Sequence, residues 1–251
     1  MLNRLMLVVI LAALVASIVG CGPIQGAKQE LVVTQGADAE TLDPQATTTR
    51  ATLNISGAIC EHLVRLDYDQ NKLVGILATS WTTLNDTTWQ FKLRQGVKFH
   101  NGEEFDANAV KYSIERIADP AKKWPTLKYV TDFAKVEVVD KYTINLVTKA
   151  PAPLTPLNLT MVYIVPPKYA EEAGVQGFAN KPIGTGPFKF VEWVKDERIV
   201  LEANTSYWGG KPALSRIVFK PIPEASTRTA ALKTGQSDIV NPLLIADVPG
   251  L

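Results

Sequence analysis

The alternation of apolar and polar residues is most regular in the middle of the chain. Trp89, Phe91 and Leu93 alternate with polar residues, and a period of two predicts a strand with one face in water. Further on, apolar side chains recur at steps of three and four across residues 110–117, the period of an amphipathic helix. Asp106 stands just ahead of this helix, where its carboxylate can accept hydrogen bonds from the free amides of the first turn. The two patterns predict a strand followed by an N-capped helix.

Strands and helices follow one another along the rest of the chain. A strand opens near Leu31, and a helix covers residues 52–60. The strands KVEVVD and YTINLVTK meet at the turn Asp140-Lys141. A strand MVYIVPP ends at a proline pair, and a short helix KYAEEAG is closed by Gly174. The last third predicts three strands, a helix and a final strand: FKFVEWV, ERIVLEA, SRIVFKPI, EASTRTAALKTG and SDIV.

The first twenty residues differ from everything that follows them. Arg4 precedes an uncharged apolar run over residues 5–20, the pattern of an export signal peptide. A retained anchor helix is the alternative, although the run is short for a membrane span, which needs about 20 apolar residues. Residues 18–21 read Ile-Val-Gly-Cys and resemble the lipobox of bacterial lipoproteins, in which the cysteine is diacylated and becomes the mature N-terminus. We therefore expect a signal peptide over 1–20, lipidation at Cys21 and a polar tether over 21–29.

The composition is that of a globular protein with a sizeable core. The chain has 251 residues, 46% of them hydrophobic, and its 26 basic residues are balanced by 25 acidic residues. No block of Lys and Arg with interleaved aromatic residues is present in the sequence, so no nucleic-acid partner is expected. No cofactor motif was found either.

The segment KFHNGEEFDANAVKYSIERI raises the question of a metal or acid–base site, because His100 lies close to Glu103 and Glu104. A structural interpretation accounts for these residues better. Asn101-Gly102 is a strong turn signal, and acidic residues are favoured just before a helix N-terminus. A metal site needs two or three further ligands, and the sequence offers no second histidine nearby. We expect no metal and no catalytic residue here.

Two further motifs have a chemical and a structural interpretation. Cys60 is the single cysteine after Cys21; its apolar neighbours indicate a buried, inert thiol, and no partner orients it with His62 as a catalytic pair. The run GTGP over residues 184–187 lacks the spacing of a phosphate-binding loop and does not open a helix. It is better explained as a tight crossing of two backbone segments where side chains do not fit.

Three blocks of sequence resemble the extracellular solute-binding proteins of family 5, the peptide- and nickel-binding components of ABC importers. They are LVVTQGADAETLDP, the segment LATSWTTLNDTTWQFKLRQGVKFHNGEEFDANAVKYSIERIADP, and the segment from PIGTGPFKFVEW through YWGGKPALSRIVFKPIPEASTRTAALKTGQSDIV. The blocks occur in order between residues 31 and 241. Members of the family are about twice as long, so the chain resembles an N-terminal half.

The resemblance implies an α/β fold, a type II periplasmic-binding-protein-like lobe with a mixed sheet. Lobe I would comprise residues 30–60 and 167–251, and residues 61–166 would form an inserted small α+β subdomain. The second lobe would be absent from this chain. An incomplete lobe could then present an exposed sheet edge and an apolar cleft wall.

The resemblance also implies a function, which is capture of a solute between two lobes and its delivery to permease subunits in the membrane. We expect the solute to be a short peptide. We also expect the protein to be exported and lipid-anchored to the cell membrane, facing the periplasmic or extracellular side. In the resembling proteins two loops reach the cleft. In this sequence those loops contain Thr48, Thr49 and Arg50, and then Lys123 and Trp124. Arg50 would pair with a ligand carboxylate and Trp124 would cover an apolar group.

Other classes of function stay open at this stage. An exported metal-dependent hydrolase would use His62, His100 and nearby carboxylates, and a lipoprotein of this kind could also be a receptor or scaffold without a transport role. Surface pairing of Arg50 and core packing of Trp124 are the structural alternatives for those two residues. Among binding proteins, nickel-chelate, glutathione and oligosaccharide ligands remain alternatives to a peptide.

Overall fold

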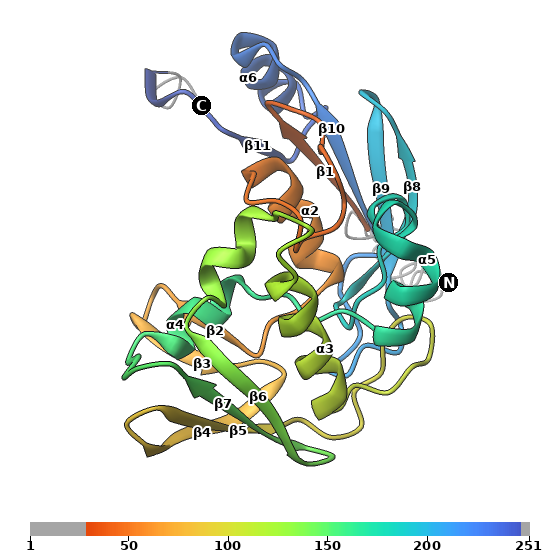
Figure 1. The fold of residues 1–251 in the computed structure, drawn as a ribbon. Coiled ribbons are helices and arrows are strands. Elements are labelled where there is room, and N and C mark those ends of the chain that lie inside the picture. Colours follow the sequence, from red (N-terminus) through yellow and green to blue (C-terminus); the bar gives the residue numbers. More distant parts are fainter. Residues whose placement is uncertain (1–28, 247–251) are drawn as a thin grey trace, which may run out of the picture.

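The computed structural model describes residues 29–246 and contains two main sheets (Figure 1). The predicted signal peptide, Cys21 and most of the tether lie outside the described residues. The first sheet has five strands in the order β11-β1-β10-β9-β8. The second has four, in the order β4-β5-β7-β6. The helices α2 and α3 lie between the two sheets in the view of Figure 1.

The five-stranded sheet is mixed, as the sequence led us to expect. Its strands are β1 (Glu30–Gln35), β8 (Phe188–Val194), β9 (Arg198–Ala203), β10 (Arg216–Pro221) and β11 (Ile239–Asn241). β1 runs parallel to both of its neighbours, β10 and β11, while β9 pairs antiparallel with β10 and with β8. Helix α2 (Arg50–Ile59) packs its buried Ile55 and Ile59 into the core formed with this sheet.

The four-stranded sheet is entirely antiparallel. Its strands are β4 (Ala78–Asn85), β5 (Thr88–Leu93), β6 (Phe133–Asp140) and β7 (Thr143–Thr148). Helix α3 (Ala107–Ala118) contributes Val110, Ile114 and Ile117 to the largest hydrophobic core, which this sheet shares. The predicted N-cap is confirmed, because the Asp106 carboxylate accepts hydrogen bonds from the backbone amides of Asn108 at 2.8 Å and Ala109 at 3.1 Å.

The remaining elements connect the strands and helices of the two sheets. A hairpin of β2 (Val64–Asp67) and β3 (Lys72–Gly75) precedes β4, and the 3-10 helix η1 (Pro125–Tyr129) follows α3. Helix α4 (Thr155–Asn158) and the 3-10 helix η2 (Leu159–Met161) lead to α5 (Pro167–Asn180). Helix α6 (Ala225–Lys233) connects β10 to β11.

Two predicted elements differ from the structure. The predicted strand MVYIVPP is wrong: its start is in η2, and the buried residues after it form single contacts, such as the bridge of Tyr163 to His62, instead of a ladder. The Val165 amide donates to the side chain of Ser113 at 3.0 Å. Helix α5 continues beyond Gly174 to Asn180, although Gly174 interrupts it with a φ of 65°, so the predicted glycine stop is a kink.

The GTGP run is a tight crossing, as predicted. A Cβ on Gly184 would lie 2.1 Å from the Ile59 carbonyl oxygen, and one on Gly186 would lie 2.6 Å from the Ala58 carbonyl oxygen. The Gly186 amide donates to the Ile59 oxygen at 2.9 Å. The end of α2 and the segment before β8 therefore touch backbone to backbone.

Candidate functional site

The loop before α2 positions the first group of predicted site residues. Thr47 is buried, and its hydroxyl oxygen accepts from the Thr49 amide at 3.0 Å and shares a hydrogen bond with the Thr49 hydroxyl at 3.0 Å. Thr49 occupies the N-cap position of α2 without a capping side-chain bond, and Arg50 is the first helical residue. Thr48 and Arg50 are exposed. This loop therefore presents one hydroxyl and one guanidinium to solvent at the positive end of a helix.

Arg50 borders a small cavity of about 200 Å³. The cavity lies where the parallel strands β1 and β11 end, beside the first turn of α2. Residues from these three places line it: Gln35, Gly36, Ala37, Arg50, Ala51, Asn54, Asn241 and Pro242. Ligands of open α/β sheets bind outside the carboxyl ends of the strands, so the location is a favourable one.

One wall of this cavity contains an unpaired polar atom. Gln35 is 2% exposed, and its side-chain amide nitrogen donates to the Ala51 carbonyl at 3.4 Å. Its side-chain oxygen is buried and has no hydrogen-bond partner among the described residues. Such an acceptor costs about 1–3 kcal/mol when it is left unsatisfied.

The second group of predicted residues lies before η1. Lys123 is exposed and has a φ of 52°, whereas the Trp124 side chain belongs to the large core and is only 9% exposed. The Trp124 ring lies against the Arg116 guanidinium, 4.5 Å from the ring centroid, and the Lys122 ammonium is 5.5 Å from the same ring. Core packing is thus what the structure shows for Trp124, and Lys123 is the residue of the pair that reaches solvent.

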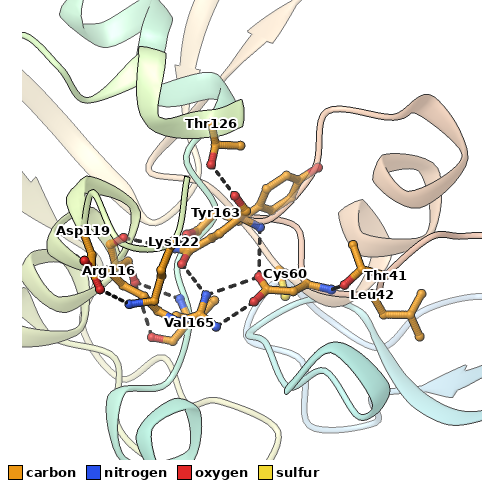
Figure 2. Close-up of polar contacts among 12 residues, drawn as sticks. Thr41, Leu42, Cys60, Arg116, Asp119, Lys122, Thr126, Tyr163 and Val165 are labelled. Carbon is orange, nitrogen blue, oxygen red and sulfur yellow. Dashed lines mark hydrogen bonds and ion pairs between the residues drawn. The ribbon is translucent and has the colours of Figure 1, made fainter. Parts of the chain in front are cut away.

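A buried polar network joins the two groups, and sequence reasoning missed it. The Arg116 guanidinium donates to both carboxylate oxygens of Asp43, at 2.6 and 3.3 Å, and to the side-chain oxygen of Gln45 at 2.7 Å. The Gln45 side-chain nitrogen donates to the carbonyls of Ser113 and Tyr163. Figure 2 shows Arg116 and Tyr163 within this network, at the meeting point of α3 and the segment before α5.

The same network fixes the segment that contains Trp124. The Thr126 hydroxyl donates to the Gln45 carbonyl, so η1 is bonded directly to the loop before α2 (Figure 2). The available signal was the presence of a charged residue, Arg116, between the apolar Ile114 and Ile117 of α3. A charge on the buried face of a helix requires a buried partner, because an isolated buried charge is strongly unfavourable.

Both histidine side chains are held by contacts with other residues of the fold. His100 Nδ1 accepts from the Gly184 amide at 3.4 Å, and its Nε2 lies 2.9 Å from the Gly186 carbonyl oxygen. Burial lowers the pKa of His100 to about 4, so the ring is neutral at pH 7. The His62 ring packs against Tyr163 with centroids 3.8 Å apart, and burial lowers its pKa to about 3. Among residues 29–246 no group of three or more His, Cys, Asp or Glu could hold a metal ion.

Cys60 and the YWGG loop over residues 207–210 also contact other parts of the fold. Cys60 is 1% exposed, its thiol lies 3.8 Å from the Ile183 carbonyl, and burial raises its pKa. The Glu61 carboxylate accepts from Tyr207 at 2.6 Å, Trp208 at 2.8 Å and Thr185 at 2.8 Å. Glu61 thereby attaches the loop around residues 207–208 to the glycine crossing.

Comparisons with known proteins identify relatives of this chain. The family model of the bacterial extracellular solute-binding proteins, family 5 Middle, matches residues 72–251. The glutathione-binding protein GsiB of Salmonella paratyphi A is 33% identical over 238 residues, covering 93% of this chain and 46% of that protein. Its counterpart in Escherichia coli K12 is 31% identical and is covered to 43%.

Solved structures have the same fold. The Helicobacter pylori binding protein DppA, in complex with the peptide STSA, superposes with a TM-score of 0.81 at 33% identity, covering 88% of this chain and 48% of that one. The oligopeptide-binding protein AppA of Bacillus subtilis, in complex with a nonapeptide, gives a TM-score of 0.80 at 27% identity, with 89% and 46% covered. The chain spans about half the length of the relatives it matches.

The fold and the similar solved structures define the class of protein: a lobe of the periplasmic-binding-protein type, with a mixed sheet. More particularly, the chain belongs to the bacterial extracellular solute-binding proteins of family 5. Proteins of this family are binding proteins of transport systems. None of the helices within residues 29–246 has the length and apolar character needed to cross a membrane.

Proposed function

We propose that this chain forms one wall of a solute-binding site in an ABC importer and that the solute is a short peptide or a peptide-like molecule. The observation that carries the proposal is the position of Arg50 at the first turn of α2, beside a cavity at the carboxyl ends of β1 and β11. Its guanidinium has no hydrogen-bond or ion-pair partner among the described residues. The captured solute would be held between this lobe and a second lobe, and then passed to a membrane permease.

The chemistry of the cavity supports a carboxylate-containing solute. The guanidinium offers a planar pair of donors that matches a carboxylate, and the N-terminus of α2 favours negative charge at the same place. The relatives described above bind glutathione, the peptide STSA and a nonapeptide. Each of these ligands has a terminal carboxylate. An uncharged oligosaccharide would use this guanidinium less well.

The other predicted site residues have separate roles in the proposal. Thr48 and Thr49 would bond the ligand backbone next to Arg50, and Lys123 would approach it from the loop before η1. The Trp124 ring is packed into the core, so it would not touch the ligand. It would instead hold the Arg116 guanidinium in place. The division into lobe I (30–60 and 167–251) and an inserted subdomain (61–166) stays a prediction, as does the absence of a catalytic group.

The location of the protein is part of the same proposal. A signal peptide over residues 1–20 and acyl chains on Cys21 would place the chain outside the cell membrane and anchor it there. Two or three acyl chains give a lasting anchor, because each buried CH₂ contributes about 0.8 kcal/mol. Mass spectrometry of the exported protein tests this: a mature N-terminus at Cys21 with the added mass of the acyl chains is the expected result.

The test of the ligand class is calorimetric titration of the full-length protein with the dipeptide Met-Leu and with glutathione. Arg50→Ala should weaken binding of free Met-Leu by about tenfold or more, because a charged hydrogen-bond pair is lost. It should leave binding of the carboxamide form of Met-Leu unchanged relative to the unmodified protein. Arg65→Ala, which removes another exposed arginine, is the matched control and should bind all three ligands normally.

Two results would count against the proposal. If Arg50→Ala lowers the affinity for free and amidated Met-Leu equally, Arg50 does not contact the ligand carboxylate. If no peptide binds, the ligand is not a peptide. Recovery of cleaved Met-Leu after incubation, abolished by a chelator, would instead favour the metal-dependent hydrolase.

A further inference from the structure

A second cavity, of about 300 Å³, shares no residue with the one beside Arg50. It lies where the loop over residues 96–102 meets the beginning of β8 and the loop after β9. Its volume corresponds to about ten water molecules at liquid density, which is enough for a small anion with an organic substituent. The polar residues that line it are Lys98, His100, Lys189, Asn204 and Ser206, with Trp208 forming an aromatic wall.

Two lysines from separate parts of the chain line this cavity. Lys98 comes from the loop before α3, and Lys189 comes from β8. Among the described residues no ion pair involves either ammonium group. The cavity therefore has two positive charges that no bonded carboxylate neutralises.

The nearest carboxylates are engaged elsewhere or exposed. Glu104 accepts from Tyr142 at 2.5 Å and forms an ion pair with Lys141 at 2.9 Å. These hydrogen bonds lower its pKa, and the Lys98 charge adds to the shift. Glu202 is directly opposite Lys189 in the β8–β9 ladder, but it is exposed and forms no ion pair with it.

Two neutral side chains that can donate hydrogen bonds, Asn204 and Ser206, also line the cavity. Asn204 is 5% exposed; its side-chain nitrogen donates one hydrogen to the Gly186 carbonyl at 3.2 Å, and its oxygen accepts from the Ser206 amide at 3.2 Å. These two bonds fix the amide and leave its second N–H available. The Ser206 hydroxyl is exposed at the same wall. His100 is neutral with both ring nitrogens engaged, so it adds no charge.

The cavity is close to the point where the N-terminal segment enters the fold. The Gln29 carbonyl accepts from the Ser215 amide at 2.8 Å, and the Ser215 carbonyl accepts from the Ala203 amide, the residue next to Asn204. Only seven residues separate Gln29 from Cys21, and the eight steps between them span about 28 Å at full extension. If Cys21 is acylated, this side of the fold is held near the phosphate groups of the membrane.

We propose that the cavity between Lys98 and Lys189 is an anion site that binds a phosphate group, using the second amide hydrogen of Asn204 and the hydroxyl of Ser206 as additional donors. The phosphate can belong to a phospholipid headgroup or to a free phosphate compound, and the chemistry of recognition is the same for both. The site stands apart from the proposed peptide site: it needs neither Arg50 nor a second lobe. Only the lipid source depends on acylation at Cys21.

The first experiment is calorimetric titration of the mature full-length protein, produced without acyl chains, with inorganic phosphate. Saturable binding that weakens with added NaCl is expected, because exposed charges are screened by salt. The double variant Lys98→Ala/Lys189→Ala should lower the affinity by at least about tenfold, since charge-assisted hydrogen bonds are the strong ones. Lys72→Ala, an exposed lysine of β3 outside the cavity, is the matched control and should bind phosphate normally.

The second experiment distinguishes the two sources. The same proteins are sedimented with phosphatidylcholine vesicles that contain or lack phosphatidylglycerol. Binding to the anionic vesicles that the double variant loses identifies a lipid headgroup, and phosphate binding without vesicle binding identifies a free anion; both support the site. An absence of saturable phosphate binding, or equal phosphate affinity in the double variant and Lys72→Ala, would overturn it. Met-Leu titration of the double variant reports separately on the peptide site and should be unchanged.

Discussion

The Arg116 guanidinium and the Asp43 carboxylate form a two-bonded ion pair that is almost completely buried. The side chains are 3% and 0% exposed, and the shorter of the two N–O distances is 2.6 Å. Trp124 lies against the guanidinium, and Phe178 approaches it at 5.2 Å. The pair thereby holds the loop before α2, helix α3 and helix α5 together behind the predicted ligand-binding residues.

Replacing Arg116 by methionine tests the importance of this pair. The change leaves Asp43 buried without its partner, which costs about 3–5 kcal/mol in the free energy of unfolding. Urea denaturation measures the loss. Lys111→Met on the same helix removes a surface pair with Glu115, 3.6 Å apart, and should change stability by less than about 1 kcal/mol. Similar losses in both variants would contradict a structural role for the buried pair.

His100 should make the fold sensitive to acid. Its folded-state pKa, about 4, is below the ordinary 6.5, so the unfolded chain binds the proton first as the pH falls. The stabilisation is complete above pH 6.5 and is lost progressively toward pH 4, by up to about 3 kcal/mol. His100→Gln can retain the bonds to Gly184 and Gly186 without titrating. The fall in unfolding free energy from pH 7 to pH 4.5 should therefore be smaller in this variant, and an equal fall would contradict the assignment.

Glu61 should show the opposite pH dependence. Burial raises the pKa of Glu61 above 4.5, although its hydrogen bonds with Tyr207, Trp208 and Thr185 oppose the shift. The folded protein therefore holds the proton longer than the unfolded chain, and stability decreases as the pH rises above 4.5 through the folded-state pKa.

Two substitutions at this position measure the effect. Glu61→Gln keeps acceptors for the indole and removes the charge, so its stability relative to the unmodified protein should increase with pH across that window. Glu61→Ala leaves buried donors unpaired and should cost about 3 kcal/mol at neutral pH. A constant difference between the unmodified protein and Glu61→Gln at all pH values would show that the carboxyl group does not titrate there.

The glycine crossing offers a substitution experiment with an internal control. Gly184→Ala would place its Cβ 2.1 Å from the Ile59 carbonyl oxygen, a contact that only movement of the backbone can relieve, and we expect a loss of about 3 kcal/mol or more. Gly57→Ala in α2 places its Cβ 3.5 Å from the Tyr163 hydroxyl, which is an ordinary contact. Its higher helix propensity should stabilise the protein by about 0.5–1 kcal/mol. Thermal denaturation compares the two, and equal effects would contradict the tight crossing.

Much of the fold could be predicted from local patterns. β5 and α3 were predictable because their periods of two and of three to four residues are set by which face is buried, and the cap at Asp106 needs only its own first turn. The segment around Tyr163 was mistaken for a strand because an apolar run of this length suits any buried extended chain. Whether such a run pairs with a neighbouring strand depends on residues far away in the sequence.

Arg50 and the loop before it were named as site residues from the family resemblance, and their contact with a ligand stays a prediction. The cavity beside Arg50 could not be predicted, because Gln35 and Asn241 come together only through the pairing of β1 with β11. Core packing of Trp124 was left open as the alternative to a ligand contact. Its ring could be placed only after Arg116 was known to face inward, and no periodic pattern reports the partner of a single charged residue on an apolar face.

The parallel pairing of β1 has a consequence for how the molecule comes to be folded. Val32 near the start of the chain is hydrogen-bonded to Asp238, 206 positions later, and Val33 is in register with Ile239. Contacts this distant in sequence form slowly, because a long loop must close before they contribute. The five-stranded sheet therefore cannot be completed until residues 239–241 have been synthesised. Until β10 and β11 are available, β1 lacks both of the strands that flank it, whereas the four-stranded sheet needs only residues 78–148.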